Sequence, residues 1–190
     1  MSAIVITPLT ADELVRHVSE LGALLHACVH DGASVGFVMP YSVEESEAFW
    51  RGNVLPALRS DGLMLFVARQ GDAIAGTVQL AHDTMPNQRH RAEVRKLLVH
   101  PAARRQGVAR ALMMELERHA HRLQRSLLTL DTRTGDHAEP LYTALGYRSA
   151  GVIPGYARGS HDADRFDATT IMYKRLDVAG EACVRPSSNI

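Results

Sequence analysis

Cysteine is scarce in this sequence, which contains only Cys28 and Cys183 among its 190 residues. Secreted domains that depend on disulfides carry several cysteines at recurring spacings in a short chain. Here one cysteine lies in an apolar stretch and the other in a polar segment, and nothing in the sequence pairs them. We therefore expect both thiols to be reduced.

Long hydrophobic runs are absent as well. No apolar run approaches the roughly 18 residues that are needed to cross a bilayer. Residues Met1–Ile4 also lack the basic segment, followed by an apolar one, that marks a secretory signal. We therefore expect a cytoplasmic protein without a membrane partner.

The chain has no net charge, because 21 Lys+Arg balance 21 Asp+Glu. Proteins that bind nucleic acid draw much of their affinity from an excess of positive charge, so this balance favours a small-molecule partner and no nucleic acid. A length of 190 residues with 46% hydrophobic content suits one globular domain. We expect that domain to span residues 1–176, in a monomer or a homodimer, and residues 177–190 to form a flexible tail.

A metal site is not expected either. The sequence contains ten histidines, but His119 and His121 lie two positions apart in a helical pattern and so face different sides of the helix.

The apolar residues that are present follow the periods of strands and helices. We expect strands at Ile4–Ile6, Leu63–Arg69, Ala73–Ala81, Ala92–Val99, Leu127–Leu130, Arg148–Ile153 and Ala168–Tyr173. We expect helices over Leu14–Leu25, from the capping box Ser42-Val43-Glu44-Glu45, from Val108 to Leu123, and over Ala138–Leu145 with Gly146 closing it. A hairpin, a third strand and then a strand-helix-strand crossover indicate an α/β (α+β) fold, a mixed and mainly antiparallel sheet of about seven strands flanked by helices.

The turn Arg104–Ala109 lies between the strand that ends at Val99 and the helix that begins at Val108. The first amides of a helix lack partners and its N-terminus carries about half a positive charge, so this turn suits an anionic phosphate. Between residues 89 and 125 the sequence also carries ten arginines and lysines against three acids. The alternative is an ordinary exposed loop before a helix with a basic polar face. No Gly-Lys-Ser/Thr of a Walker A loop and no Gly-x-Gly-x-x-Gly of a dinucleotide site occurs here.

The whole arrangement resembles the acyl-CoA-binding signature of the GNAT superfamily of N-acyltransferases. The matching residues are Leu97-x-Val99-x-Pro101-x-x-Arg104-x-x-Gly107-x-Ala109. A second stretch, residues 138–147, is similar to that family's A-x-x-L-Y-x-x-x-G-F/Y pattern, although Gly135 stands where many members carry Asn. The resemblance covers about residues 1–176 and implies the GNAT fold with acetyl-CoA as cosubstrate. It implies that the coenzyme is bound by Leu97, Leu98, Val99, Arg104, Arg105, Gln106, Gly107, Val108, Ala109 and Arg110.

Within that superfamily the sequence looks most similar to the tabtoxin-resistance acetyltransferases. The matching stretches are residues 29–37, 91–97, 128–132 and 154–156. This resemblance implies transfer of an acetyl group to the amine of a small molecule, such as a toxin or an antibiotic-like amino acid. The stretch 29–37 offers an imidazole, a carboxylate, a hydroxyl and an apolar rim for such an acceptor, from His30, Asp31, Ser34 and Phe37, unless it is only a structured loop.

Acetyl transfer to an amine needs a base, because an ammonium has no lone pair with which to attack a thioester. Only a small fraction, well under about 1%, of an amine with a pKa near that of lysine is neutral at pH 7. The resemblance implies that Glu93 and Asp131 remove the proton, directly or through water, and that Tyr142 is the acid that protonates the departing thiolate. A main-chain amide near Leu98 and Val99 is the expected donor to the developing oxyanion. The alternatives are exposed strand-end carboxylates paired with Arg91 or Arg133, and a tyrosine packed on the sheet with its hydroxyl bonded elsewhere.

Three other functions remain open from the sequence. The acceptor of the acetyl group could be a protein N-terminus or a lysine, which requires an open groove. The chain could also be a non-catalytic acyl-CoA-binding module, which the presence of Glu93, Asp131 and Tyr142 disfavours. A nucleic-acid-binding role for the arginine-rich helix is opposed by its interspersed acids and by the neutral chain.

Overall fold

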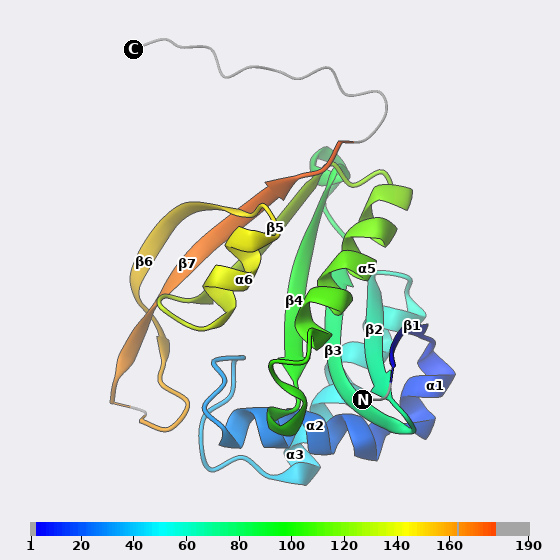
Figure 1. Ribbon diagram of the computed structural model, residues 1–190, viewed down its shortest axis with the longest axis vertical. Helices are drawn as coiled ribbons and strands as arrows, with labels where there is room; N and C mark the ends of the chain where they lie inside the picture. Colours follow the sequence, from blue (N-terminus) through cyan, green and yellow to red (C-terminus); the bar gives the residue numbers. More distant parts are fainter. Residues whose placement is uncertain (1–2, 163, 178–190) are drawn as a thin grey trace.

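The computed structural model describes residues 3–162 and 164–177, and these form one mixed seven-stranded sheet with helices on both faces (Figure 1). The strand order is β1-β2-β3-β4-β5-β7-β6, and every neighbouring pair is antiparallel except β4 and β5. The expected mixed, mainly antiparallel α/β sheet is thereby confirmed. Of the predicted tail, residues 178–190 lie outside the described residues.

All seven predicted strands are present. They are β1 Ile4–Leu9, β2 Leu63–Gln70, β3 Ala73–Ala81, β4 Arg91–Val99, β5 Leu127–Arg133, β6 Arg148–Arg158 and β7 Phe166–Arg175. The helical elements are α1 Ala11–Arg16, α2 Val18–His30, α3 Val43–Phe49, the π-helix η1 Trp50–Val54, α4 Leu55–Arg59, the 3₁₀ turns η2 Pro86–Gln88 and η3 Pro101–Ala103, α5 Val108–Arg122 and α6 Ala138–Ala144. Strand β1 continues through Pro8, which an edge strand tolerates because one side of it needs no ladder hydrogen bond.

The first predicted helix is wrong as a single element, because it divides at His17. The backbone of His17 leaves the helical region (φ −106°, ψ 15°), ending α1 and beginning α2. The apolar spacing continues across the break, since Leu14 and Leu21 pack in the same core. The predicted capping box at Ser42 is confirmed: the amide of Glu45 donates to Ser42 Oγ (3.1 Å) and the amide of Ser42 donates to the Glu45 carboxylate (2.7 Å).

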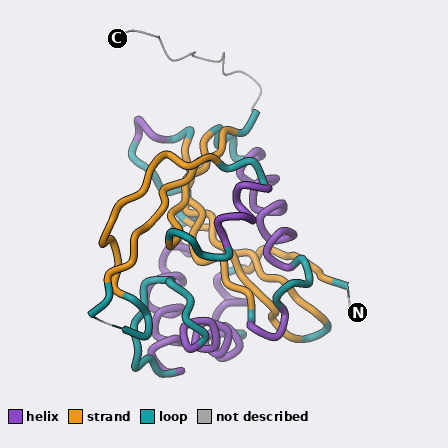
Figure 2. Tube along the Cα trace, turned by 60° about the vertical axis from the view of Figure 1, so that its left-hand side comes forward, coloured by secondary structure: helices purple, strands orange, loops and turns teal. Residues whose placement is uncertain are grey.

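Two hydrophobic cores lie on the two faces of the sheet, as the alternation of side chains along β2 shows. Phe66 and Ala68 pack with α5 and α6, whereas Leu65 and Val67 pack with α1, α2 and η1. Figure 2 shows the helices on either side of the strands. The face covered by α5 and α6 is called the α5 face below, and the other is called the α2 face.

Strands β4 and β5 pair over only three residues, Arg91–Glu93 with Leu127–Thr129, and then diverge. Strand β4 also carries a bulge, because two steps along β3, from Thr77 to Gln79, are opposed by three steps along β4, from Leu98 to Arg95. Such a bulge bends a strand and changes the direction of its side chains. The divergence and the bulge occur side by side, and they open the sheet where α5 begins.

Gly76 is the point at which β3, β4 and α5 approach most closely. A Cβ at this position would lie 2.6 Å from the Leu98 carbonyl oxygen, 3.1 Å from Val108 Cγ1 and 3.2 Å from Leu112 Cδ1. We expect Gly76→Ala to destabilise the fold by about 1–3 kcal/mol, as overpacking in a core does, measured by urea unfolding. The control is Gly52→Ala, where nothing lies within 4 Å of the added Cβ. Equal stability of Gly76→Ala and the wild type would contradict this packing.

Candidate active site

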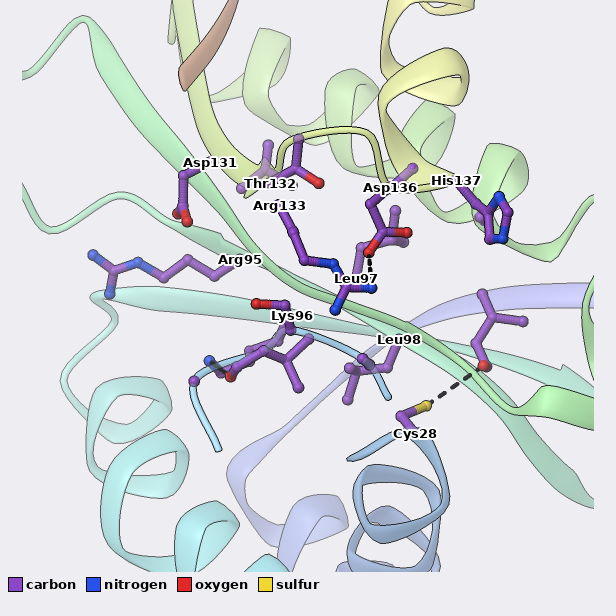
Figure 3. Close-up of a pocket in the computed structure, with 18 of the residues that line it drawn as sticks. Cys28, Arg95, Lys96, Leu97, Leu98, Asp131, Thr132, Arg133, Asp136 and His137 are labelled. Atoms are coloured by element: carbon purple, nitrogen blue, oxygen red, sulfur yellow. Dashed lines mark hydrogen bonds and ion pairs between the residues drawn. The ribbon is translucent and has the colours of Figure 1, made fainter. Parts of the chain in front are cut away.

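A cavity of about 1320 Å³ occupies the place where β4 and β5 diverge. Its walls come from β4, β5, the turn before α5, the loop between α2 and α3, the start of α6 and the ends of β6 and β7. Figure 3 shows the wall formed by Arg95 to Leu98 on one side and Asp131 to Arg133 on the other. Segments that are far apart in the sequence thus meet around one space.

The turn before α5 borders this cavity with free backbone amides. Gly107 is the N-cap of α5 with φ +85°, and Arg105 has φ +61°. The first backbone hydrogen bond of the helix is from Ala111 to Gly107, and the amides of residues 105–110 have no backbone acceptor within the described chain. A Cβ on Gly107 would meet nothing within 4 Å. The open space and the free amides are what an anionic phosphate requires.

Nearly all residues expected to bind the coenzyme line the cavity, namely Leu97, Leu98, Val99, Arg104, Arg105, Gly107, Val108, Ala109 and Arg110. Gln106 is not among the lining residues. Its side chain donates to the Ala102 carbonyl (3.1 Å) and accepts from Gln70 (2.9 Å), so it secures the turn from outside.

The bulge in β4 shapes the backbone at Lys96 and Leu97. Lys96 has φ +49°, a conformation that is uncommon for residues other than glycine. Thr77 Oγ1 donates to the Lys96 carbonyl at 3.3 Å and so supports the bulge. Neither Lys96 nor Leu97 has a partner in the β3 register, and from Val94 onward β4 has none in β5. The strand therefore offers unpaired backbone to the cavity.

Glu93 and Asp131 lie on the α2 face of the sheet, where both line the cavity. Glu93 is paired in register with Thr129, and Asp131 lies two residues further along β5, so the three share a face. Glu93 accepts from Arg95 at 2.6 Å, whereas no cation lies within ion-pair distance of Asp131 among the residues that the structure describes. The alternative partners Arg91 and Arg133 bond elsewhere, to Gln88 and to Asp136, and the arginine that pairs with Glu93 is Arg95.

Tyr142 reaches the same cavity from the other face. It belongs to α6, is only 6% exposed, and packs with the core on the α5 face. Burial, reinforced by the negative charges of Asp131 and Asp136, raises the pKa of Tyr142 far above its usual value. The phenol therefore keeps its proton and can donate it. Carboxylates on one face and a phenol on the other flank the gap between β4 and β5.

The loop between α2 and α3 contributes part of the expected acceptor pocket. Asp31 and Ser34 line the cavity, and Asp31 forms an ion pair with Arg104 of the turn before α5. His30 and Phe37 are not among the lining residues. His30 Nε2 lies 2.8 Å from the Tyr41 carbonyl, and Phe37 stacks on Tyr41 with ring centroids 4.6 Å apart. These two side chains hold the loop.

Several cavity residues were not found by sequence reasoning. Arg133 donates to Asp136 (2.9 Å, Figure 3) and to the Gly32 carbonyl (3.2 Å), and lies 3.8 Å from Asp167. It thereby links β5, β7 and the loop between α2 and α3. The sequence signal was a single arginine after a strand, which is too common to be informative.

Two buried polar side chains also border the cavity. Gln79 is 3% exposed and its Nε2 has no hydrogen-bond partner. Cys28 is 2% exposed, and burial raises the pKa of its thiol to about 11. Its Sγ donates to the Val99 carbonyl at 3.5 Å (Figure 3), so this thiol is a packed, protonated group. Cys183 lies outside the described residues.

The described ranges 3–162 and 164–177 contain neither a metal-binding cluster nor a candidate membrane span. No group of three or more His, Cys, Asp or Glu is placed there to hold a metal ion. None of the helices in those ranges has the length and the apolar character that a membrane span requires.

Comparisons with known proteins agree with this geometry. An uncharacterized N-acetyltransferase of Azospirillum brasilense, encoded in the hisH-hisA intergenic region, is 33% identical over 114 residues, which are 59% of this chain and 66% of that relative. The chain thus matches just under two thirds of that protein. Two solved structures share the fold. The ribosomal-protein-alanine N-acetyltransferase of Brucella melitensis is 21% identical with a TM-score of 0.74, over 90% of this chain and 99% of that one. The structure of yncA, a putative acetyltransferase of Salmonella typhimurium, with its cofactor acetyl-CoA is 18% identical with a TM-score of 0.73, over 95% of this chain and 99% of that one.

The family model of the acetyltransferase (GNAT) family matches residues 29–147. That range begins near the end of α2 and includes the turn before α5, Glu93, Asp131 and Tyr142. From the matched range, the seven-stranded sheet with its diverging strands and the free amides before α5, we conclude that this chain belongs to the acetyltransferase (GNAT) family.

Proposed function

We propose that this protein is an N-acetyltransferase that transfers the acetyl group of acetyl-CoA to the amine of a small molecule. One observation carries the proposal: a single cavity connects the free amides before α5 with the carboxylates of Glu93 and Asp131 and the phenol of Tyr142. Bound acetyl-CoA supplies an activated acetyl thioester.

The residues of this chain fit that coenzyme at its anionic end. The amides from Arg105 to Ala109 converge beside an open position at Gly107, and Arg105 and Arg110 add positive charge at the same end of the cavity. The backbone from Leu97 to Val99, which has no partner in β5, continues from there into the gap between β4 and β5. Amides along this strand would hold the pantetheine arm and donate to the carbonyl oxygen of the acetyl group.

The catalytic roles follow from the two faces of the gap. Glu93 and Asp131 would accept the proton of the acceptor ammonium on the α2 face, which exposes the lone pair of the nitrogen. Tyr142 would donate a hydrogen bond to the departing sulfur on the opposite face and so stabilise the thiolate, because burial keeps that phenol protonated. Base and acid thus lie on opposite sides of the reacting carbon, as direct attack requires.

A small acceptor is favoured because contacts beside the acceptor side of the cavity tie its walls to one another. The amide of Met39 donates to the Ser160 carbonyl (2.8 Å), and His161 Nε2 lies 3.3 Å from the Val29 carbonyl. Arg133 adds its bond to the Gly32 carbonyl. These contacts join the end of α2 and the loop that follows it to β5 and to the connection between β6 and β7. The resemblance of residues 29–37 to tabtoxin-resistance acetyltransferases supports a toxin-like or antibiotic-like amino acid as acceptor.

A thiol-release assay tests this function directly. The purified protein is incubated with acetyl-CoA and a panel of small amines, including a β-lactam amino acid, alongside peptides with free N-termini. Release of thiol that depends on a small amine is the expected result. Turnover of the peptides alone would overturn the small-molecule assignment, and acetyl-CoA binding without any turnover would identify a non-catalytic module.

Gly107→Val tests the coenzyme cradle, by which we mean the free amides from Arg105 to Ala109. The valine side chain would occupy the open position beside the free amides, and we expect the Kd for acetyl-CoA to rise at least about tenfold, equivalent to about 1.4 kcal/mol. The measurement is isothermal titration. The matched control is Gly71→Val, which also has a positive φ (+62°) and open space around its Cβ but lies in the β2–β3 turn. Equal affinities in the two variants would remove the cradle from the proposal.

A further inference from the structure

Gln79 is a buried side chain in the wall of the cavity, and its amide nitrogen is unsatisfied within the described residues. It is 3% exposed, lines the cavity, and makes no side-chain hydrogen bond within the described residues, and its Nε2 is buried without a partner. A buried polar group without a partner destabilises the folded protein, and such groups in native proteins require an explanation. A ligand that accepts a hydrogen bond in the cavity would remove this cost.

Lys96 lies beside Gln79 on the α2 face. Gln79 is the register partner of Arg95, the residue before Lys96. The bulge directs the Lys96 side chain toward the loop between α2 and α3, where its Nζ donates to the Val35 carbonyl at 2.6 Å and lies 5.3 Å from the ring centroid of Phe37. An ammonium has three donors, and the Val35 carbonyl takes one of them.

Lys96 also differs from three arginines that line the cavity. Arg95 pairs with Glu93, Arg104 with Asp31, and Arg133 with Asp136. Lys96 has no carboxylate within ion-pair distance among the described residues. Burial lowers the pKa of Lys96 because it disfavours the charged ammonium, and an anionic ligand beside that ammonium would stabilise it. Lys96 and Asp131 are close enough for their opposite charges to attract each other, but within the described ranges neither has an ion-pair contact.

This arrangement complements a zwitterion. We propose that Gln79 and Lys96 bind the carboxylate of an amino-acid acceptor, while Asp131 and Glu93 receive its amine. The inference rests on the proposed function and narrows its acceptor to amines that carry a carboxylate. One cation and one neutral donor match a monoanion, whereas the free amides and arginines at the start of α5 suit the more highly charged phosphates at the other end of the cavity.

Lys96→Met provides the first test. Methionine retains the packing against Phe37 and Phe49 but loses the charge. Steady-state kcat/KM is measured for L-amino acids and for their carboxamides, which retain the shape and remove the negative charge. We expect Lys96→Met to lower kcat/KM for the acids at least tenfold and for the carboxamides less than threefold. Because amidation also changes the basicity of the amine, the comparison is made between variants for each substrate.

The matched control is Lys174→Met, which makes the same replacement at the other lysine of the sequence. Lys174 also lies near an aromatic ring, 5.6 Å from the centroid of Tyr147, but pairs with Glu117 and does not line the cavity. We expect unchanged kcat/KM for both substrate classes in this variant. Equal losses for acids and carboxamides in Lys96→Met would reduce Lys96 to a support of the loop and overturn the inference.

Gln79→Leu tests the neutral donor. Leucine has a similar size and removes an unpaired buried polar group, so we expect an equal or higher melting temperature. The expected loss of kcat/KM is at least fivefold for acids and for carboxamides alike, because both offer an oxygen, with no change in the KM for acetyl-CoA. Unchanged kinetics in this variant would exclude Gln79 from the site.

Isothermal titration of the same amino acids into the CoA-saturated protein separates this inference from the proposed function. Binding of acids that depends on Lys96, without any turnover, would support the carboxylate site and contradict the transferase. Turnover of carboxamides or peptides, without binding or turnover of any acid, would retain the transferase and overturn the carboxylate site. Absence of both acid binding and acid turnover likewise overturns it.

Discussion

Replacing both Glu93 and Asp131 by their amides is expected to lower kcat/KM by about 10³-fold, within the range of ~10² to 10⁴ that general base catalysis supplies. Both carboxylates border one cavity on one face of the sheet. Each can cover in part for the other through water. We therefore expect the double variant to lose more than the product of the losses in Glu93→Gln and Asp131→Asn. Steady-state kinetics across pH would measure this coupling.

A control distinguishes loss of a base from loss of negative charge. Glu20→Gln combined with Asp72→Asn removes two carboxylates that do not line the cavity, and we expect kcat/KM to change less than twofold. A base effect should alter the acidic limb of the kcat/KM profile and persist at high salt, whereas a long-range field should be screened. If the loss of kcat/KM in the double variant equals the product of the single losses and the acidic limb of the profile does not move, the two carboxylates are structural or orienting groups.

Tyr142→Phe is expected to lower kcat by about 10²-fold, the lower end of what a positioned acid contributes, with the KM for acetyl-CoA changed less than twofold. The phenol acts mainly on the departing sulfur, so its loss falls on kcat. The pKa of Tyr142 is raised by burial. The phenol is therefore protonated at every pH below that raised pKa, and its ionisation should produce no basic limb in the kcat profile at working pH.

The matched control for this prediction is Tyr147→Phe. The two rings are neighbours, with centroids 5.8 Å apart, but Tyr147 does not line the cavity and its hydroxyl is buried without a hydrogen-bond partner. We expect this variant to keep its kcat. If Tyr142→Phe also retained the wild-type kcat, Tyr142 would be a packing residue and the acid would be water.

Local signals predicted those parts of the fold that depend on neighbouring residues. The capping box at Ser42 and the glycine-containing turn before Val108 were found because the partners of each group lie within a few positions in the sequence. The sequence did not reveal the break at His17, because the apolar spacing continues across it.

The acceptor half of the candidate site could not be predicted in the same way. The positions of Gln79 and Lys96 depend on the pairing of β3 with β4 and on a bulge within it. The contacts of Arg133 depend on Gly32, which lies 101 residues earlier in the loop after α2, and on Asp167 of β7. These contacts arise from long-range strand pairing, for which the local sequence pattern carries no signal. Of the predicted acceptor residues, His30 ends α2 and Phe37 lies in the loop that follows, and packing turns both side chains toward Tyr41.

The short pairing of β4 with β5 divides the sheet into two antiparallel blocks, β1–β4 and β5–β7, that are joined by three residue pairs. Within each block the strands pair over longer registers. A molecule held in the gap contacts both blocks at once and adds its bonds to the weakest junction of the sheet. Part of the free energy of binding then stabilises the arrangement in which the two blocks stay together. We therefore expect the two blocks to resist separation more strongly when the gap is occupied than when it is empty.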